Sequence, residues 1–402
     1  MAIKTNKPIL LLKDLAQENR FAFVDCRSDF RAILDHEGKL KVRNVFTQPF
    51  ENLDEDEQEI ALALVAHGLV ETVADLVAMG EPEQRTGSKL SRVELELTKS
   101  CNLACLHCFT RKEKDRMDFA LIERNLPDLI ELGVVEIVLN GGEIFLHEDL
   151  GQILEFLGNS FKLILFSNGT VPGSLDTIAS APIARVNVSL DGFRESHDYL
   201  RGAGTFDRTV AFVRGLVERD IRTQINSVVF EKNLDRLEPF IEFCREDLKV
   251  CGVKLSTIYP MGSALNHPEL FENEQSTLHR EVYQKYLKED LPGMPDGNHL
   301  PCLAGITKIF IDTSGNVFPC RLFEDERFSM GSLNDLNLGP LYRKFIESPN
   351  EFTSFEIDSL EACRNCAALP TCKTGCRARA FLTEGDIRAA DTFACRHHVE
   401  VK

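Results

Sequence analysis

The stretch Cys101-Asn-Leu-Ala-Cys105-Leu-His-Cys108 places three cysteines in one short loop, first three and then two residues apart. Cysteine thiolates are the usual ligands of iron–sulfur clusters. A closed tetrahedral metal site needs four protein ligands, whereas this loop supplies three. The spacing therefore predicts a metal site with one open position, which is typical of a reactive site rather than of a structural one.

The composition narrows the class of protein. The chain has 402 residues, 43% of them hydrophobic, and a formal net charge of −17. This length allows two or three domains. The acidic balance argues against nucleic acid and anionic membranes as partners. No apolar run reaches about 18 residues, and the start does not resemble a signal peptide, so we expect no transmembrane helix and a cytoplasmic location.

From about residue 90 the sequence alternates between predicted strands and helices. Strands are expected at 93–97, 136–140, 162–167, 185–190, 223–229 and 253–259, and helices at 119–131, 148–157, 206–218 and 234–247. This alternation indicates an α/β fold with a parallel sheet, which right-handed crossovers curl toward a partial (β/α)6, TIM-like barrel. Chemistry in such barrels lies at the carboxyl ends of the strands, where the three-cysteine loop follows the first one.

Three further motifs end predicted strands of this sheet: Asn140-Gly-Gly-Glu143, Ser167-Asn-Gly-Thr170 and Ser189-Leu-Asp-Gly192. Together with the cysteine loop they resemble the radical S-adenosylmethionine superfamily. The resemblance implies that the three cysteines hold a [4Fe–4S] cluster whose open iron binds S-adenosylmethionine. It further implies that a 5′-deoxyadenosyl radical removes a hydrogen atom from the substrate. Half of a zinc site is the alternative for the loop alone.

The resemblance also implies contacts to S-adenosylmethionine. In the family the Gly-Gly-Glu element receives the amino group, although Ile144 here replaces the usual proline. The contacts expected at the ends of the second and third strands are Gly141, Gly142, Glu143, Ser167 and Asn168.

The fourth strand and the cysteine loop add three expected contacts. Ser189 and Arg201 are assigned to the ribose and the carboxylate, because the planar fork of an arginine suits a carboxylate. A surface arginine that caps a loop is the alternative. His107 is expected near the adenine, or else fills space beside the cluster. Asp191 fits turn chemistry equally well, because Asp-Gly pairs are common in turns.

Seven cysteines lie after residue 300, whereas Cys26, Cys244 and Cys251 stand alone and are interpreted as buried hydrophobic residues. The spacing of the seven resembles that of the SPASM domain, which implies two auxiliary [4Fe–4S] clusters. The first set is Cys363, Cys366, Cys372 and Cys395, and the second is Cys302, Cys320 and Cys376. Lys308 stands where some relatives have another cysteine, so we expect an open iron or a non-cysteine ligand. A zinc site is the alternative.

Residues 1–88 are predicted to form a small α+β domain. Strands are expected at 20–25 and 32–45, with Asp35-His-Glu-Gly38 as a hairpin turn, then helices within 53–79 and a linker at 80–87. Such a segment is compatible with a winged-helix-like module that grips a peptide leader by adding a strand. An extension packed on the barrel is the alternative. The predicted division is therefore 1–88, 89–295 for the barrel and 296–402 for the SPASM domain.

Arg321 bears on the substrate. Sulfatase-maturing relatives have an aspartate base directly after the equivalent of Cys320, and an arginine cannot accept a proton at neutral pH. The sequence therefore favours a maturase that modifies a ribosomally made precursor peptide by crosslinking, epimerisation or a similar change. We expect an electron donor such as flavodoxin or ferredoxin. The alternatives are a haem- or cofactor-pathway enzyme, a sulfatase-maturing type and a non-catalytic iron–sulfur carrier.

Overall fold

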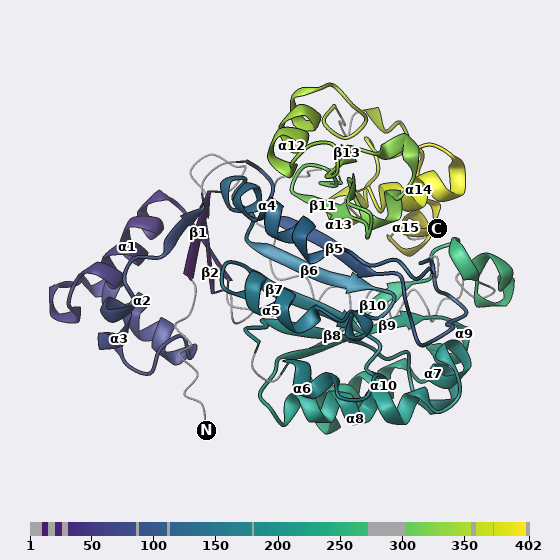
Figure 1. The fold of residues 1–402 in the computed structure, drawn as a ribbon, viewed down its shortest axis with the longest axis horizontal. Coiled ribbons are helices and arrows are strands. Elements are labelled where there is room, and N and C mark those ends of the chain that lie inside the picture. The colour runs from purple at the N-terminus through teal and green to yellow at the C-terminus, as the bar shows by residue number, and fades with distance from the viewer. Residues whose placement is uncertain are drawn as a thin grey trace.

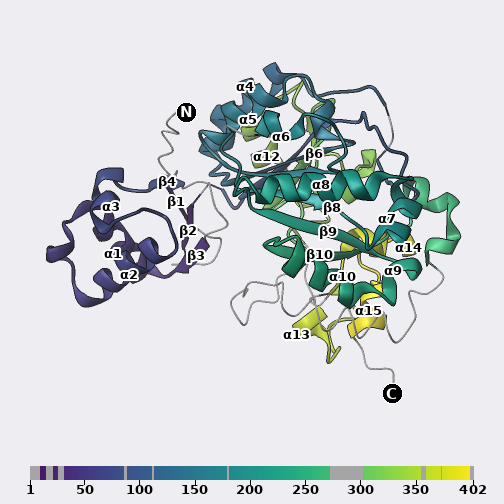
Figure 2. The ribbon, with the colours of Figure 1, turned by 90° about the horizontal axis from the view of Figure 1, so that it is seen from below.

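The structure is a computed structural model that describes residues 10–14, 21–25, 31–85, 88–110, 113–178, 181–271, 302–354, 359–372 and 374–398. Its N-terminal part stands to one side of a central curled sheet, and its C-terminal part lies along the β5 side of that sheet (Figures 1 and 2). None of the helices in these ranges is long and apolar enough to cross a membrane.

The N-terminal part is a four-stranded sheet with helices on it. The strand order is β3-β2-β1-β4. The strands are β1 (Leu10–Asp14), β2 (Phe21–Asp25), β3 (Arg31–Leu34) and β4 (Glu83–Arg85). The helices are α1 (His36–Thr47), the 3-10 turn η1 (Phe50–Asn52), α2 (Glu55–Ala66) and α3 (Val73–Met79). Phe23 of the sheet shares one apolar core with the helical residues Phe46, Leu64 and Leu76.

Two predictions for this part were wrong. The strand expected at 32–45 ends at Leu34, because Asp35 begins helix α1 instead of a hairpin: its carboxylate accepts a hydrogen bond from the Gly38 N–H at 2.8 Å. The linker expected at 80–87 contains strand β4, which pairs in parallel with β1. The helices expected within 53–79 are confirmed as α2 and α3. Arg20 of the first expected strand and Cys26 lie outside the described residues.

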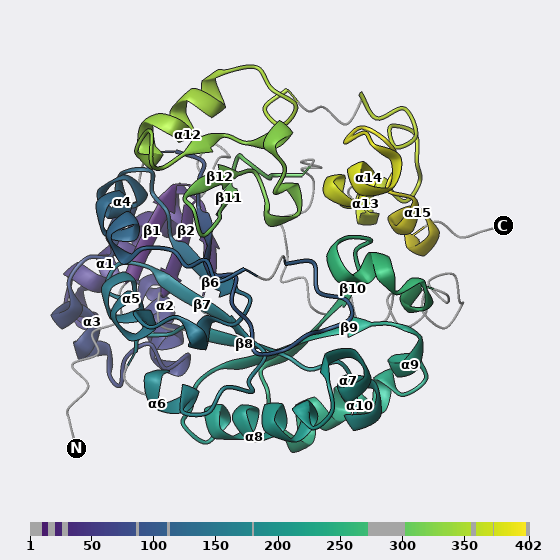
Figure 3. The ribbon, with the colours of Figure 1, turned by 45° about the vertical axis from the view of Figure 1, so that its right-hand side comes forward.

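The central sheet confirms the predicted parallel strands. They are β5 (Arg92–Thr98), β6 (Glu136–Gly141), β7 (Lys162–Ser167), β8 (Arg185–Ser189), β9 (Thr223–Val229) and β10 (Gly252–Thr257). The helices α6 (Ser174–Ile178), α8 (Thr205–Val217) and α10 (Leu237–Glu242) lie on the outer side of its curve (Figure 3). The remaining elements are α4 (Phe119–Glu131), η2 (Ile144–Leu146), α5 (Leu150–Gly158), α7 (Arg194–Arg201), α9 (Glu231–Leu234), the π-helix η3 (Phe243–Asp247), η4 (Gly262–Asn266) and η5 (Pro268–Phe271).

The side chains of β5 alternate between the main apolar core and the concave interior of the curled sheet. Val93, Leu95 and Leu97 belong to the main apolar core between sheet and helices. Because side chains alternate across a strand, Glu94 and Glu96 face the interior. Polar groups are thus brought to the concave side, directly before the three-cysteine loop.

The C-terminal part continues the same sheet. Strand β11 (Lys308–Ile311) pairs in parallel with β5, and β12 (Asn316–Phe318) and β13 (Gly331–Ser332) follow it, so the full order is β10-β9-β8-β7-β6-β5-β11-β12-β13. The other elements here are η6 (Arg321–Phe323), η7 (Glu326–Phe328), α12 (Leu338–Glu347), α13 (Leu369–Cys372), α14 (Arg377–Glu384) and α15 (Thr392–His398). Because Cys320 follows β12, this sheet carries the tail cysteine close to β5.

Candidate functional site

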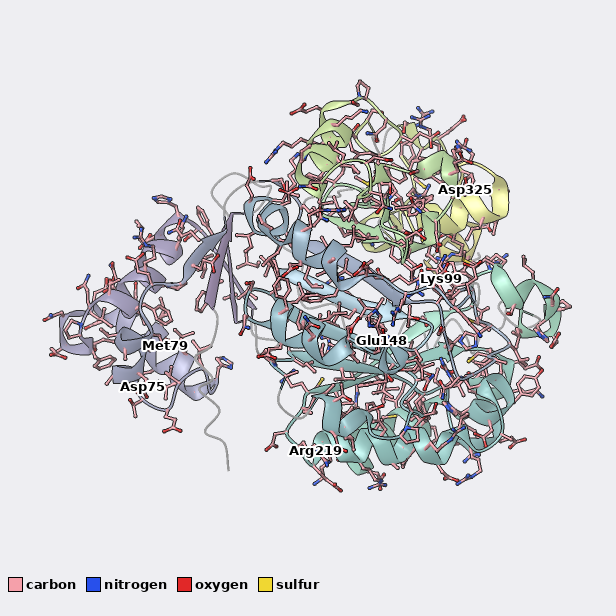
Figure 4. The ribbon with its side chains drawn as sticks, viewed as in Figure 1. Asp75, Met79, Lys99, Glu148, Arg219 and Asp325 are labelled. Carbon is pink, nitrogen blue, oxygen red and sulfur yellow. The ribbon has the colours of Figure 1, made fainter. Side chains whose placement is uncertain are left out.

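The three-cysteine loop starts where β5 ends and is held by backbone hydrogen bonds to other elements. Leu106 N donates to Leu200 O at 2.9 Å, and Ser263 N donates to Cys108 O at 2.7 Å. All three thiols are partly buried. Lys99, two residues before Cys101, marks this strand end at the junction of the barrel and the C-terminal part (Figure 4). The loop is therefore fixed between barrel elements.

Gly141 and Gly142 let the end of β6 pack on the backbone that leads into this loop. A Cβ atom at Gly141 would lie 2.3 Å from Thr98 O, and one at Gly142 would lie 2.4 Å from Ser100 O. The close packing is sealed by hydrogen bonds from Gly142 N to Thr98 O at 2.7 Å and from Glu143 N to Ser100 O at 2.9 Å. The two glycines thus support the cysteine loop directly.

Glu143 joins the ends of β6 and β7 beneath the loop. It is buried, and its carboxylate accepts hydrogen bonds from Ser167 Oγ at 2.9 Å and from Asn168 N at 2.7 Å. Burial raises the pKa of Glu143 to about 7, while these donors favour the carboxylate. Asn168 Nδ2 in turn donates to Asn102 Oδ1 at 3.0 Å and lies 3.9 Å from Cys101 Sγ. Three of the expected contact residues therefore form one network that reaches the first cysteine.

Arg201 is buried at the end of α7 and faces the cysteine loop. Its Nε donates to Asp191, and its Nη1 lies 4.0 Å from Cys105 Sγ. Asp191 is fully buried and also accepts a hydrogen bond from Val228 N at 2.8 Å. Burial alone would raise the pKa of Asp191, but Arg201 and two histidines hold it below its usual range. Asp191 is thus the ionic partner of Arg201, a role that the turn interpretation missed although Asp191 lies two residues after the end of β8.

His107 and Ser189 complete the expected set. Burial, helped by Arg201, lowers the pKa of His107 to about 4, so the imidazole is neutral. Its Nε2 lies 3.5 Å from Arg201 Nη2, and its buried Nδ1 has no hydrogen-bond partner among the described residues. Ser189 ends β8 half-buried, on the same side as the polar interior residues. A neutral imidazole with a spare nitrogen fits the expected neighbour of a planar base.

The tail cysteines gather in two groups. Cys302, Cys320 and Cys376 pack against one apolar cluster. The pKa of the Cys320 thiol is raised to about 11, mainly by burial. Cys302 also raises this pKa, whereas the Lys308 ammonium lowers it. Lys308 therefore faces this group and favours its thiolates, although it is not a cysteine-like ligand.

The second group gathers around α13 and α15. Burial raises the pKa of the Cys372 thiol to about 11, with Cys395, Cys363 and Cys366 adding to the effect. No three His, Cys, Asp or Glu side chains in the part of the chain that the structure describes converge as tightly as ligands of a single ion.

Comparisons with known proteins match both the region of the three-cysteine loop and the region in which the tail cysteines begin. Residues 95–244 match the family model of the Radical SAM superfamily, and residues 295–367 match SPASM, an iron-sulfur cluster-binding domain. The AdoMet-dependent heme synthase of Oleidesulfovibrio alaskensis is 27% identical over 74% of this chain and 84% of its own length. A second relative is the antilisterial bacteriocin subtilosin biosynthesis protein AlbA of Bacillus subtilis. It is 29% identical over a match that covers 59% of this chain and 56% of AlbA.

A solved structure is similar over almost the entire chain. It is Streptococcus suis SuiB bound to the precursor peptide SuiA, with a TM-score of 0.62, 14% identity, and coverage of 98% of this chain and 100% of SuiB. At this identity the likeness concerns the fold, and it includes the N-terminal part.

Proposed function

Because the chain has a radical SAM domain and a SPASM domain, it is a radical S-adenosylmethionine enzyme, and we propose that it modifies a residue of a ribosomally made precursor peptide. A radical SAM domain binds a [4Fe–4S] cluster and S-adenosylmethionine, and a SPASM domain binds auxiliary iron–sulfur clusters. When bound, these groups supply a 5′-deoxyadenosyl radical that can remove a hydrogen atom from an unactivated C–H bond. The chain supplies the positioning and the exclusion of water.

The residues around the cysteine loop suit this cofactor set. We assign Cys101, Cys105 and Cys108 to the first cluster, because thiolates are its ordinary ligands and the loop is held rigidly. Arg201 turns its Nη atoms toward the loop while Nε is held by Asp191, so a carboxylate there meets a pre-oriented fork. His107 offers an unpartnered buried nitrogen nearby. The remaining assigned contacts are Gly141, Gly142, Glu143, Ser167, Asn168 and Ser189.

For the SPASM part we propose two auxiliary [4Fe–4S] clusters. The two cysteine groups of the structure correspond to the two ligand sets, with four thiols around α13 and α15 and three thiols facing Lys308. The three-thiol group leaves one iron for a ligand other than cysteine. A small electron carrier such as flavodoxin or ferredoxin would supply the electron for the first cluster.

The similarity to SuiB supports a peptide substrate. The matched structure is SuiB bound to its precursor peptide, and the match covers 98% of this chain. The heme synthase match leaves out about a quarter of the chain, covering 74% of it. Arg321 holds two carboxylates of the barrel and supplies no base beside Cys320, which argues against a sulfatase-maturing activity. A haem-pathway enzyme is the second candidate, favoured by the heme synthase relative.

Mass spectrometry tests the proposal. The reconstituted enzyme is incubated without oxygen with S-adenosylmethionine, a reductant and each short peptide that a search finds encoded beside its gene. We expect a changed peptide mass, which for a crosslink is the loss of two hydrogen atoms, and release of 5′-deoxyadenosine. Heat-inactivated enzyme is the control. An unchanged peptide together with conversion of a tetrapyrrole propionate would contradict the peptide proposal and support the second candidate.

We further propose that the chain divides at 1–88, 89–295 and 296–402, and that the first segment binds the leader of the precursor. In the described residues β3 and β4 each have one neighbour strand, so an extended peptide can add to either edge. Deleting residues 1–88 is expected to weaken peptide binding at least about tenfold, as measured by fluorescence anisotropy. Iron content should stay unchanged in the shortened chain. Unchanged peptide affinity would contradict a leader-binding role.

A further inference from the structure

Arg321 reaches from the SPASM part into the barrel. It directly follows Cys320, yet its Nη2 donates to Thr110 Oγ1 at 2.8 Å, two residues beyond Cys108. The same nitrogen lies 3.4 Å from the carbonyl oxygen of Gly141. One guanidinium therefore contacts the loop of the first cysteine site, the Gly-Gly-Glu element and the chain next to a tail cysteine.

Glu96 is the buried carboxylate at the centre of these contacts. It faces the interior of the sheet from β5 and is 1% exposed. Arg321 Nη2 lies 3.3 Å from its Oε1. Its Oε2 is buried and has no hydrogen-bond partner within the described part of the chain. A buried carboxylate oxygen normally accepts hydrogen bonds, so an oxygen left without any fits a site that takes up a proton or meets a ligand.

Building on the proposed function, we propose that Glu96 accepts, at Oε2, the proton that the substrate loses when it is oxidised, and that Arg321 is the residue that positions it. In a crosslinking reaction the radical takes the first hydrogen atom from a C–H bond. The new bond then forms between that carbon and a second atom that carries hydrogen. This second hydrogen leaves as a proton to Glu96. The oxidant for the remaining electron would be an oxidised iron–sulfur cluster, which the tail cysteines would hold. The step therefore needs no hydroxide ion as a proton acceptor.

The surroundings of Glu96 suit a proton acceptor near neutral pH. Burial raises its pKa to about 7, although the Arg321 guanidinium opposes the rise. The charged groups that face it are Lys99 at the end of β5, Arg321 and Glu324 from the SPASM part, and Asp312 after β11, of which the two cations lower its pKa and the two carboxylates raise it. Glu94 lies two residues earlier on the same side of β5 and also faces Arg321, at 3.8 Å.

Infrared difference spectroscopy of the reconstituted enzyme tests protonation without any substrate. Wild type minus Glu96→Gln should show the C=O stretch of a protonated buried carboxyl group, fading as pH rises through about 7. Glu143 has a similar pKa but is present in both proteins, so its band cancels. A difference spectrum without this band would overturn the proposal.

Turnover with the precursor peptide tests the role in the reaction. Glu96→Gln should release 5′-deoxyadenosine at a rate within about twofold of wild type, while modified peptide falls at least about hundredfold. Wild-type product formation should rise with pH through the pKa of Glu96, because the carboxylate is the accepting form. Arg321→Gln should move that inflection to higher pH, since the guanidinium holds the pKa down.

The matched control is Glu136→Gln, an interior-facing glutamate at the opposite end of β6 that pairs with Arg92; it should keep wild-type product formation. If Glu96→Gln loses iron, Glu96→Asp retains a carboxyl and should give product with a displaced pH inflection. Wild-type yield and pH profile in either Glu96 variant would overturn the proposal. If wild-type enzyme leaves every tested peptide unmodified, the proposed function is contradicted instead. The infrared spectra would still show whether Glu96 is protonated in the enzyme without substrate.

Discussion

Replacing Cys105 with alanine is expected to abolish release of 5′-deoxyadenosine and to lower the iron content from about 12 to about 8 atoms per chain. The thiol is partly buried, 4.0 Å from Arg201 Nη1, in the loop to which we assign three cluster ligands. Losing one of three thiolates removes the first cluster, whereas the tail cysteines keep the two auxiliary ones. Iron and sulfide analysis, with chromatographic assay of 5′-deoxyadenosine, measures both effects.

The control for this variant is Cys251→Ala, outside the two cysteine regions. Cys251 is exposed, so its interpretation as a buried hydrophobic residue was wrong. It should leave iron content and S-adenosylmethionine cleavage at wild-type levels. Retention of cleavage by Cys105→Ala would contradict the assignment of the loop. A wild-type protein with about 4 iron atoms per chain would show that the auxiliary clusters are not formed.

Replacing Asp191 with alanine is expected to destabilise the fold by about 3–5 kcal/mol, because it leaves the Arg201 guanidinium buried without its ionic partner. Asp191 is fully buried and Arg201 is 9% exposed. The loss of the pair also frees the guanidinium to turn away from the cysteine loop, so binding of S-adenosylmethionine should weaken at least about tenfold. Anaerobic denaturant unfolding and equilibrium dialysis measure the two effects.

Asp207→Ala is the matched control, since Asp207 pairs with Arg194 on the surface and both side chains are more than half exposed. Its removal should hardly change the unfolding midpoint, because exposed ion pairs contribute little. The double variant Asp191→Ala/Arg201→Met should regain part of the lost stability, as no charge then stays buried alone. Equal unfolding midpoints for Asp191→Ala and Asp207→Ala would contradict the pairing.

Much of the barrel could be predicted because its signals are local. The strand at 162–167 and the helix at 119–131 were predicted to the residue, since their apolar spacing falls in short windows bounded by turns. Residues 36–47 were misassigned because a short segment with a few apolar residues fits either a strand or a helix. There the deciding contact is the Asp35 cap, together with Val45 and Phe46 packing against the sheet.

Ligand chemistry was readable from the sequence alone. The spacing of ten cysteines carries the resemblance to the two families, and the resemblance implies their division into three ligand sets, which stays a prediction. The pairing of Asp191 with Arg201 was not readable in this way. Their spacing of 10 residues has no fixed meaning until a strand end and a helix end meet.

Only the tertiary structure brings Arg321 to Glu96, residues that are 225 positions apart in the chain. Their contact depends on β11 pairing with β5 as the next strand of the barrel sheet, which places the segment after β12 over the interior end of β5. Strand order between distant segments is set by packing of the whole sheet and leaves no local pattern in the sequence. The sequence therefore determined the cysteine motifs and their expected chemistry. Only the fold decided that the Glu96 carboxylate lies between the three-cysteine loop and the tail cysteines.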